Sequence, residues 1–195
     1  MKGGRGMKLL EMKKVHEGTY LHNYELTYEN RAGRRKRFEI VSRQNLESPG
    51  DIAGRSSGIA IVAFQEEKLL LLREFRMSLN KPIYGLCSGL LEGTESAEEC
   101  ARRELMEETG LQVKHIRAIL PSSYSSAGFS DVSIRLVFLE AGGSINVRAS
   151  ENEEIAAAFY TRTQVADMLA REEFSSLAQM AASFFCGMPF HLPRL

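Results

Sequence analysis

The sequence predicts an α/β (α+β) fold, and three observations support that prediction. Short apolar runs with an extended pattern occur at 58–64 and 68–75, where they indicate buried strands. A stretch without Pro or Gly, rich in Glu, Ala, Arg and Leu, occupies 95–109 and favours a helix. Apolar residues recur at helical spacing within 161–186, which indicates helices that pack on a core. The 195 residues suit one domain, or one domain with an appendage.

The composition excludes several classes of partner. The 25 basic and 25 acidic residues cancel, so no overall field attracts a nucleic acid or a membrane surface. No apolar run approaches the roughly 18 residues of a membrane span. The basic start, MKGGRGMKLL, has no apolar core for a signal peptide. Three cysteines without a CxxC pair and four unclustered histidines indicate free thiols. We therefore predict a cytoplasmic protein.

The N-terminal part is predicted to form a small antiparallel sheet. Residues 20–28 are rich in Tyr, Leu and Thr, the turn residues ENRAG follow, and an extended pattern resumes at 36–43. The Ser-, Gly- and Pro-rich stretch 44–58 is interpreted as a linker. The predicted organisation is an N-terminal sheet region at 1–48, a main domain at 56–187 and a tail at 188–195.

The basic run RAGRRKR, at 31–37, has two interpretations. It is either a solvated hairpin tip, which we favour, or a source of side chains that reach phosphate or ribose across a dimer, through Arg34, Arg35 or Arg37. As a nucleic-acid signal the run is too short in a chain of zero net charge.

The main domain is predicted to contain further strands and two C-terminal helices. The strands are expected at 113–120, 133–139 and 156–160. A long polar loop, PSSYSSAGFSD, separates the first two and is expected to be functional. The helices are expected at 161–172, capped by Thr161 or Thr163, and at 175–186. Their Met and Phe residues are interpreted as core contacts rather than a cofactor site.

The acidic stretch 95–109 is bounded by residues that are typical of helix ends. Gly93 and Gly110 bracket it, and Gly110 stands where a helix favours a left-handed C-cap. Helical spacing places Ala97, Ala101 and Leu105 on one apolar stripe.

Three carboxylates crowd a neighbouring edge of that helix: Glu104, Glu107 and Glu108. Like charges at this spacing cost only a few tenths of a kcal/mol per pair on an exposed helix. Repulsion alone therefore leaves two interpretations open. One is a solvated acidic face with Arg102 and Arg103 as partners. The other is a site for magnesium or manganese, which favour clustered oxygen ligands.

The same stretch carries a spaced pattern of fixed residues. The pattern is Gly89, Glu95, Arg103-Glu104-Leu105, Glu107-Glu108 and Gly110-Leu111. At every fixed position it resembles the Nudix box, the signature of hydrolases that cleave nucleoside diphosphates linked to another moiety. The resemblance implies a Nudix-type α/β/α sandwich with a mixed β-sheet, and the box as a loop–helix–loop.

The resemblance also implies roles within the box. Glu104, Glu107 and Glu108 would hold divalent cations that bridge a pyrophosphate, with the backbone carbonyl of Ser88 as a further ligand. Glu107 and Arg103 are counted among the catalytic candidates as well. The implied cofactor is Mg2+, with Mn2+ as the alternative.

Three further box residues are implied to be structural. Arg103 would pair with Glu95 and orient it, Gly89 would allow a close backbone approach, and Gly110 would end the helix.

Outside the box, the chain resembles the ADP-ribose pyrophosphatase branch. That branch uses an N-terminal sheet, here 7–43, for dimer formation. By this resemblance Arg76, with Arg73 nearby, would bind substrate ahead of the box. The loop YSSAGFSDV, at 124–132, would contribute Ser126, Ala127 and Gly128 at the far end of the substrate.

A glutamate-rich loop near the C-terminal strand completes the resemblance. By position Glu151 would be the general base and Glu153 a metal ligand, with Glu154 competing for either role. A mobile loop glutamate can close over substrate and deprotonate water only in the complex. The alternative is a solvated acidic turn.

Departures from the branch weaken the substrate assignment more than the cleavage chemistry. Ala127 stands where the branch usually has Pro, Val132 where it has Glu, and Cys87-Ser88 where it often has Pro-Ala. Losing the proline loosens the loop that lines the far end of the substrate.

The sequence thus predicts a homodimeric, magnesium-dependent hydrolase that cleaves ADP-ribose or a related ADP-sugar to AMP and a sugar phosphate. One alternative is a pyrophosphatase for another nucleotide derivative, such as a nucleotide sugar, a dinucleoside polyphosphate or NADH. A non-catalytic nucleotide sensor is the other, although a sensor has no need for a complete metal site. The predicted partner is a small nucleotide, with no nucleic acid or membrane.

Overall fold

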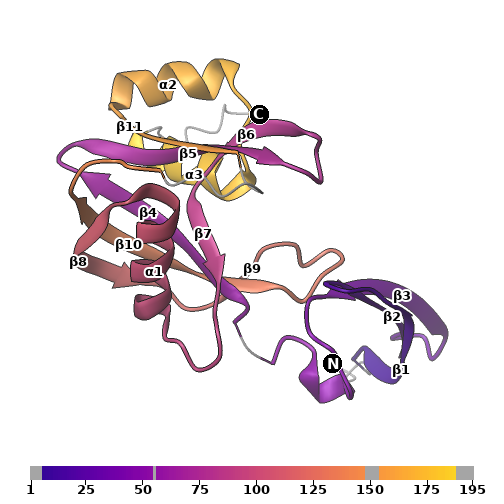
Figure 1. Cartoon of the computed structure of the whole chain (residues 1–195). Helices are drawn as coiled ribbons and strands as arrows, with labels where there is room; N and C mark the ends of the chain where they lie inside the picture. The colour runs from indigo at the N-terminus through magenta and orange to yellow at the C-terminus, as the bar shows by residue number, and fades with distance from the viewer. Residues whose placement is uncertain (1–5, 55, 148–153, 188–195) are drawn as a thin grey trace, which may run out of the picture. The chain divides into compact units, whose positions relative to one another are not determined.

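The computed structural model describes residues 6–54, 56–147 and 154–187 (Figure 1). The chain divides into two compact units. The N-terminal unit comprises residues 1–57 together with 122–134, and the main unit comprises 58–121 and 135–195. The polar loop between two predicted strands of the main domain is therefore grouped with the N-terminal sheet. None of the helices in the described ranges is long and apolar enough to cross a membrane.

The N-terminal unit contains an antiparallel sheet of three strands in the order β1-β2-β3. These strands are β1 (Lys8–Glu17), β2 (His22–Glu29) and β3 (Arg35–Ser42). The Asn30 side chain closes the β2–β3 turn by accepting hydrogen bonds from the Ala32 and Arg34 amides. The hairpin predicted from ENRAG is therefore present. Strand β1 lies within the 7–43 sheet that the resemblance implied, but its own pattern did not identify it as a strand, because two irregularities interrupt the two-residue alternation.

A small core holds this unit together. Tyr24, Leu26, Ile40 and Leu46 are all buried, and the Tyr24 hydroxyl accepts a hydrogen bond of 2.7 Å from the Leu46 amide. The stretch interpreted as a linker also contains a short 3-10 helix, Pro49–Asp51.

The polar loop is fastened to the same unit. The Val41 amide of β3 donates to the Phe129 carbonyl at 2.8 Å, and the Ala53 amide donates to the buried Asp131 carboxylate at 3.4 Å. Strand β9 (Ser123–Tyr124) pairs with Ser133 and Ile134. These contacts explain why the loop groups with the N-terminal sheet.

The main unit is built on the larger sheet, whose central order is β11-β5-β4-β10-β8. Strand β6 pairs with β5, and β7 pairs with β4. The strands are β4 (Gly58–Gln65), β5 (Lys68–Arg76), β6 (Lys81–Gly85), β7 (Cys87–Leu90), β8 (Gln112–Ile119), β10 (Ser133–Gly142) and β11 (Ile155–Tyr160). The first two residues of β10 belong to the N-terminal unit.

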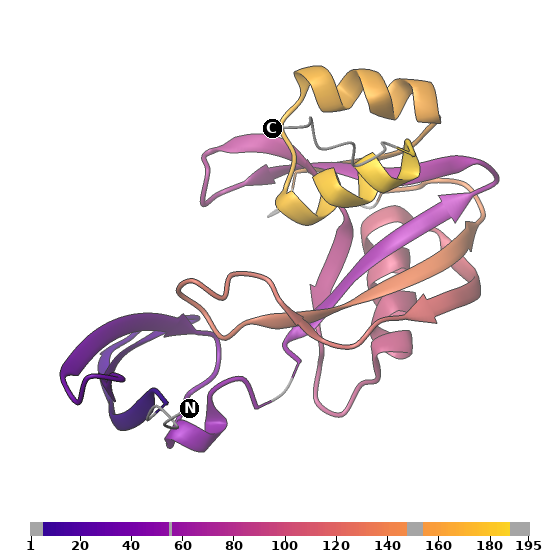
Figure 2. The ribbon, with the colours of Figure 1, turned by 180° about the vertical axis from the view of Figure 1, so that it is seen from behind.

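Helices lie on both faces of this sheet (Figures 1 and 2). They are α1 (Ala97–Thr109), α2 (Arg162–Arg171) and α3 (Ser176–Phe185). Alternation along β4 separates the faces: Ile59, Ile61 and Ala63 join the core under α1, whereas Val62 and Phe64 line a cavity beside α3. Thr161, the first of the two cap candidates, is the N-cap of α2.

The main unit differs from the sequence-based predictions at two places. The segment NKPIYGL, in which no strand was predicted, contains strand β6, where Pro82 pairs with Phe75. A proline fits there because β6 lies outside the central order of the sheet. On α3, Met180 and Phe184 were interpreted as core contacts but are 55% and 61% exposed. The buried contact of α3 is made by Ala178, Ala182 and Phe185, so the prediction holds for Phe185 alone among these Met and Phe residues.

Candidate metal-binding and catalytic site

Helix α1 presents the acidic edge because its two ends are fixed. Ser96 caps the first turn by accepting from the Glu99 amide at 3.2 Å, and Glu99 accepts in return from the Ser96 amide at 2.8 Å. Gly110 ends the helix with φ +73, the left-handed conformation that glycine adopts without strain. The predicted stripe, including Ala101 and Leu105, is buried against the sheet, which places the acidic edge at the border of that core, beside β7.

Arg103 joins the acidic residues of the box. Its guanidinium makes a bidentate pair with Glu95, at 3.0 and 2.9 Å. It also contacts Glu104 at 2.7 Å and Glu107 at 3.2 Å. The hydrogen bonds from Arg103 are the main reason that the pKa of Glu95 falls to about 2. The structure therefore contains the Arg103–Glu95 pair that the resemblance implied.

Glu104 and Glu108 carry the desolvated carboxylates of this edge. The Glu104 side chain is 13% exposed, and burial raises its pKa. Burial, with smaller contributions from the charges of Glu104 and Glu74, raises the pKa of Glu108 to about 7. Glu108 accepts hydrogen bonds from the Ser88 amide at 3.3 Å and from the Cys87 thiol. A positive charge beside this edge would relieve the cost of ionising both carboxyls.

Gly89 is required by the position of Glu104. A Cβ atom on Gly89 would lie 1.7 Å from the Glu104 Oε1 atom and 1.9 Å from its carboxyl carbon. Only glycine leaves room for the carboxylate there, which fits the close approach that the resemblance implied.

The predicted ligands are not gathered into one ligand shell. Among the side chains that the structure describes, no group of three His, Cys, Asp or Glu is placed to hold a metal ion. Arg103 pairs with Glu104 and with Glu107, whose side chain is 59% exposed, whereas Glu108 bonds to Ser88. The donors nevertheless fit a hard cation, because carboxylates and a backbone carbonyl are the oxygen ligands that Mg2+ and Mn2+ favour.

The two arginines predicted to bind substrate lie on opposite faces of strand β5. Leu70 and Leu72 face the core under α1, so alternation places Glu74 and Arg76 on that face. Arg73 points the other way, opposite Tyr84 in the register of β5 and β6. Of the two arginines, Arg76 shares a face with the carboxylates of α1.

Glu74 is a charged residue beside the candidate site that was not predicted from the sequence. It shares the face of β5 with Leu70 and Leu72 and pairs with Arg76 at 2.8 Å. A signal was available in the sequence, because a two-residue period puts Leu70, Leu72, Glu74 and Arg76 on one face of the strand. Spaced motifs such as the box do not reveal this period.

The predicted base and loop ligand, Glu151 and Glu153, lie outside the described residues. Glu154, the predicted competitor, is described, and its carbonyl accepts from the Phe75 amide at 3.1 Å. The chain that follows the glutamate-rich loop is therefore hydrogen-bonded to β5 at Phe75, between Glu74 and Arg76.

The remaining substrate-binding candidates, Ser126, Ala127 and Gly128, belong to the N-terminal unit. The Ser126 carbonyl accepts from the Phe129 amide at 3.0 Å and from the Ser130 amide at 2.9 Å, which makes a tight turn. Ala127 lines a cavity of about 230 Å3 in this unit. Its other lining residues include the aromatic Tyr28, Phe38 and Tyr124 and the buried Asp131.

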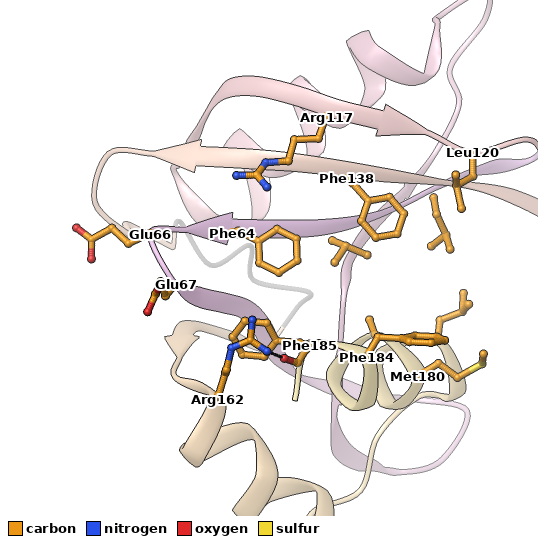
Figure 3. Close-up of a pocket in the computed structure, with 14 residues that line it drawn as sticks. Phe64, Glu66, Glu67, Arg117, Leu120, Phe138, Arg162, Met180, Phe184 and Phe185 are labelled. Atoms are coloured by element: carbon orange, nitrogen blue, oxygen red, sulfur yellow. Dashed lines mark hydrogen bonds between the residues drawn. The ribbon is translucent and has the colours of Figure 1, made fainter. Parts of the chain in front are cut away.

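A larger cavity, of about 550 Å3, lies on the opposite face of the main sheet (Figure 3). Phe64 and Phe138 from the strands face Phe184 and Phe185 from α3, and charged side chains gather at one end (Figure 3). Two of these are already engaged there: Arg117 pairs with Glu140, and the Arg162 guanidinium lies 4.8 Å from the centre of the Phe185 ring. Of the residues predicted to bind metal or substrate, none of those that the structure describes lines this cavity.

The family assignment follows from comparison with known proteins. The model of the NUDIX domain matches residues 54–181, about two thirds of the chain. The chain therefore belongs to the Nudix family, as its box predicted.

Three relatives show the range of activities among similar sequences. The ADP-ribose pyrophosphatase of Bacillus subtilis (strain 168) is 29% identical over 133 residues, which cover 68% of this chain and 65% of that protein. A GDP-mannose pyrophosphatase of Yersinia enterocolitica is 33% identical over 42% of this chain and 47% of its own. An NAD-capped RNA hydrolase of Photobacterium profundum is 33% identical over 64% and 44%. The matches thus span less than two thirds of each relative.

A solved structure confirms the fold. The crystal structure of an ADP compounds hydrolase matches with a TM-score of 0.74 and 19% identity, and the match covers 95% of this chain and 94% of that one. The predicted α+β fold, with a small antiparallel sheet and a larger sheet between helices, is therefore confirmed.

Proposed function

We propose that this protein is a divalent-cation-dependent pyrophosphohydrolase. Its proposed substrate is ADP-ribose or a related ADP-sugar, which it would hydrolyse to AMP and a sugar phosphate. The observation that carries the proposal is the pair of desolvated carboxylates, Glu104 and Glu108, on one edge of the box helix. Such an arrangement costs free energy unless a cation compensates it.

The cation would be held by the box and by the strand before it. Glu104, Glu107 and Glu108 would supply carboxylate oxygens, and Ser88 its carbonyl. When bound, the cation supplies positive charge that neutralises the pyrophosphate. Arg103 keeps Glu104 oriented through its 2.7 Å contact, while the Ser88 amide orients Glu108. Preorganisation of this kind is how a protein with little covalent chemistry of its own promotes phosphoanhydride cleavage.

The proton transfer is assigned to the glutamate-rich loop. Glu151 would take a proton from the attacking water, and Glu153 would contribute a further carboxylate to the cation, with Glu154 as the competitor for either role. Support comes from the anchoring of Glu154 to Phe75, because it fastens the end of this loop to the strand that carries Arg76.

The substrate is proposed from the relatives and from Arg76. The ADP-ribose pyrophosphatase of Bacillus subtilis matches the largest share of this chain among the three relatives above. Arg76 lies on the face that carries the carboxylates, where a guanidinium suits a phosphate. Ser126, Ala127 and Gly128 are proposed to contact the far end of the substrate.

A second candidate function is hydrolysis of another nucleotide derivative. The relatives that act on GDP-mannose and on NAD-capped RNA support it, as do Ala127 and Val132 at positions where the resemblance implied Pro and Glu. A purely nucleotide-sensing role is disfavoured, since the box carboxylates are all present.

Magnesium as the cation, a homodimer formed through the N-terminal sheet and a cytoplasmic location belong to the same proposal. Exposed apolar side chains on β1 and β3 support the dimer: Leu10, Val15 and Phe38 are 43%, 53% and 39% exposed. The basic run at 34–37 is proposed to be solvated.

The test is a release assay for AMP or another nucleoside monophosphate over a panel of substrates, with Mg2+, with Mn2+ and with a chelator. The panel comprises ADP-ribose, ADP-glucose, GDP-mannose, NADH and a dinucleoside polyphosphate. Preferential, cation-dependent cleavage of ADP-ribose or ADP-glucose is expected. Turnover that persists in chelator, or no turnover of any member, would refute the proposal.

A further inference from the structure

Glu74 lies on β5 near both parts of the proposed site, which are the carboxylates of α1 and the substrate arginine Arg76. It follows Leu70 and Leu72 on the face of β5 that packs under α1, and it pairs with Ile155 of β11 and Ile83 of β6 in the sheet register. Its side chain is 19% exposed. A carboxylate at such a position needs partners that offset the loss of hydration.

One partner is Arg76, two residues along the same face. The Glu74 Oε2 atom lies 2.8 Å from the Arg76 Nη2 atom, and the Arg76 side chain is 38% exposed. The same Nη2 atom would lie 3.8 Å from a Cβ atom on Gly85 of the neighbouring strand. The guanidinium is therefore held by a carboxylate and rests on a strand residue without a side chain, while part of it remains open to solvent.

The same face of β5 also packs against α1. Leu70 and Leu72 share a core with Leu105 of α1, and Glu108 lies about one helical turn beyond Leu105. The charge of Glu74 acts on Glu108, in keeping with this placement. Each makes the surroundings of the other more negative, and together they increase the attraction for a cation at this edge. The anchored Glu154 carbonyl lies beside the same stretch of β5.

We propose that Glu74 is a positioning residue that couples the cation edge of α1 to the substrate arginine on β5. Its carboxylate holds the Arg76 guanidinium for the phosphate of the substrate, and its negative charge strengthens cation binding beside Glu108. This inference rests on the proposed function, and it adds a residue outside the Nudix box to the site. The contrasting hypothesis is a structural ion pair that stabilises β5 and has no effect on binding.

The first experiment measures Mn2+ binding to the full chain without nucleotide, by the EPR signal of free Mn2+. Glu74→Gln removes the charge but keeps the shape and the ability to accept a hydrogen bond. We expect its dissociation constant for Mn2+ to rise on the order of fivefold, the scale for losing one unit charge near a partly hydrated site. The matched control is Glu140→Gln, which breaks another strand ion pair, with Arg117, away from the box and is expected to bind Mn2+ as the wild type does.

The second experiment separates KM from kcat, with ADP-ribose as the probe. Glu74→Ala frees Arg76, so we expect KM to rise about tenfold while kcat changes less than about threefold, since the interaction positions substrate. Glu74→Gln, which can still accept from Arg76, should raise KM less. Glu140→Gln should leave both parameters unchanged, and the melting temperature of each variant measures the structural effect.

The outcomes distinguish the inference from the proposed function. If the wild type binds Mn2+ and hydrolyses ADP-ribose, but both Glu74 variants match it in Mn2+ affinity and KM, the inference is wrong and the pair is only structural. A fall in melting temperature without either binding effect also shows that the pair is only structural. If the wild type neither binds Mn2+ nor hydrolyses any member of the substrate panel, the proposed function fails and the inference fails with it.

Discussion

The two faces of the main sheet differ in how their charges are arranged. Under α1, Glu104 and Glu108 are desolvated and close to one another, and Arg103 with the Ser88 amide offsets only part of the cost. Beside α3, a cavity of about 550 Å3 is lined mainly by apolar side chains. The difference supports placing the proposed site on the α1 face although the larger cavity lies on the other, since binding of a charged ligand depends on where charge is left uncompensated.

The largest effect is expected from Glu108→Gln on the α1 face. The amide keeps the shape of the side chain but loses the charge that would hold a cation, so kcat should fall on the order of a thousandfold. Steady-state release of AMP measures this, and a circular dichroism melt shows whether the fold survives. Turnover within a few fold of the wild type would remove the basis for a cation at this edge.

The next effect is expected from Gly89→Ala. The added methyl group would lie 1.7 Å from the Glu104 Oε1 atom, so the carboxylate must move by an ångström or more. Such a displacement of a site group should lower kcat/KM about a hundredfold.

Gly50→Ala is the matched control. Its Cβ would meet only the Ser48 Oγ atom, at 3.6 Å, so activity should be retained. Equal losses in the two variants would show that the close approach at Gly89 is not what the site requires.

Phe185→Ala, on the α3 face, should lower stability and leave activity almost unchanged, the reverse of what is expected on the α1 face. Phe185 is 8% exposed, its ring centre lies 5.9 Å from that of Phe64, and it supports the Arg162 guanidinium. Removing the ring should lower the free energy of unfolding by about 3 kcal/mol. The parameters kcat and KM for the folded protein should stay within about twofold of the wild type. Urea unfolding and steady-state kinetics at low temperature measure the two quantities, and a specific loss of kcat would place chemistry on this face.

The smallest effect is a dependence of stability on pH in protein without divalent cations. The pKa of Glu108 is about 7 in the folded state, against an ordinary value of 4.5, so the folded state holds this proton more tightly. Its contribution to stability is full below about pH 4.5 and is lost as the pH rises through about 7. Melting temperatures across this range should fall more steeply in the wild type than in Glu108→Gln, and Mg2+ should flatten the wild-type profile. Identical profiles would contradict the burial of an ionisable Glu108.

Much of the helix and its edge could be predicted from local sequence. The stretch 95–109 has no Pro or Gly and is rich in good helix formers, and Gly110 adopts the left-handed C-cap that its position indicated. The pair between Arg103 and Glu95 followed from the resemblance of the box. Local patterns suffice here because a helix satisfies its own backbone hydrogen bonds and its caps lie within a few residues.

Other parts could not be predicted, because they depend on partners far away in the chain. The two irregularities of β1 hide its alternation, and β6 contains a proline that is tolerated outside the central order of the sheet. The loop around Ala127 joins the N-terminal unit through bonds to β3 and to the 44–58 stretch. Met180 and Phe184 matched a helical stripe, yet the surface available to α3 buried only Ala178, Ala182 and Phe185.

By itself, the sequence determined the family and the acidic helix, because these depend on residue type and short spacing. Only the tertiary structure decided that Glu74 and Arg76, rather than Arg73, lie on the face of β5 that packs in one core with α1. The physical reason is that a strand places successive side chains on opposite faces. Which face meets the box helix depends on how the whole sheet packs, not on any one segment.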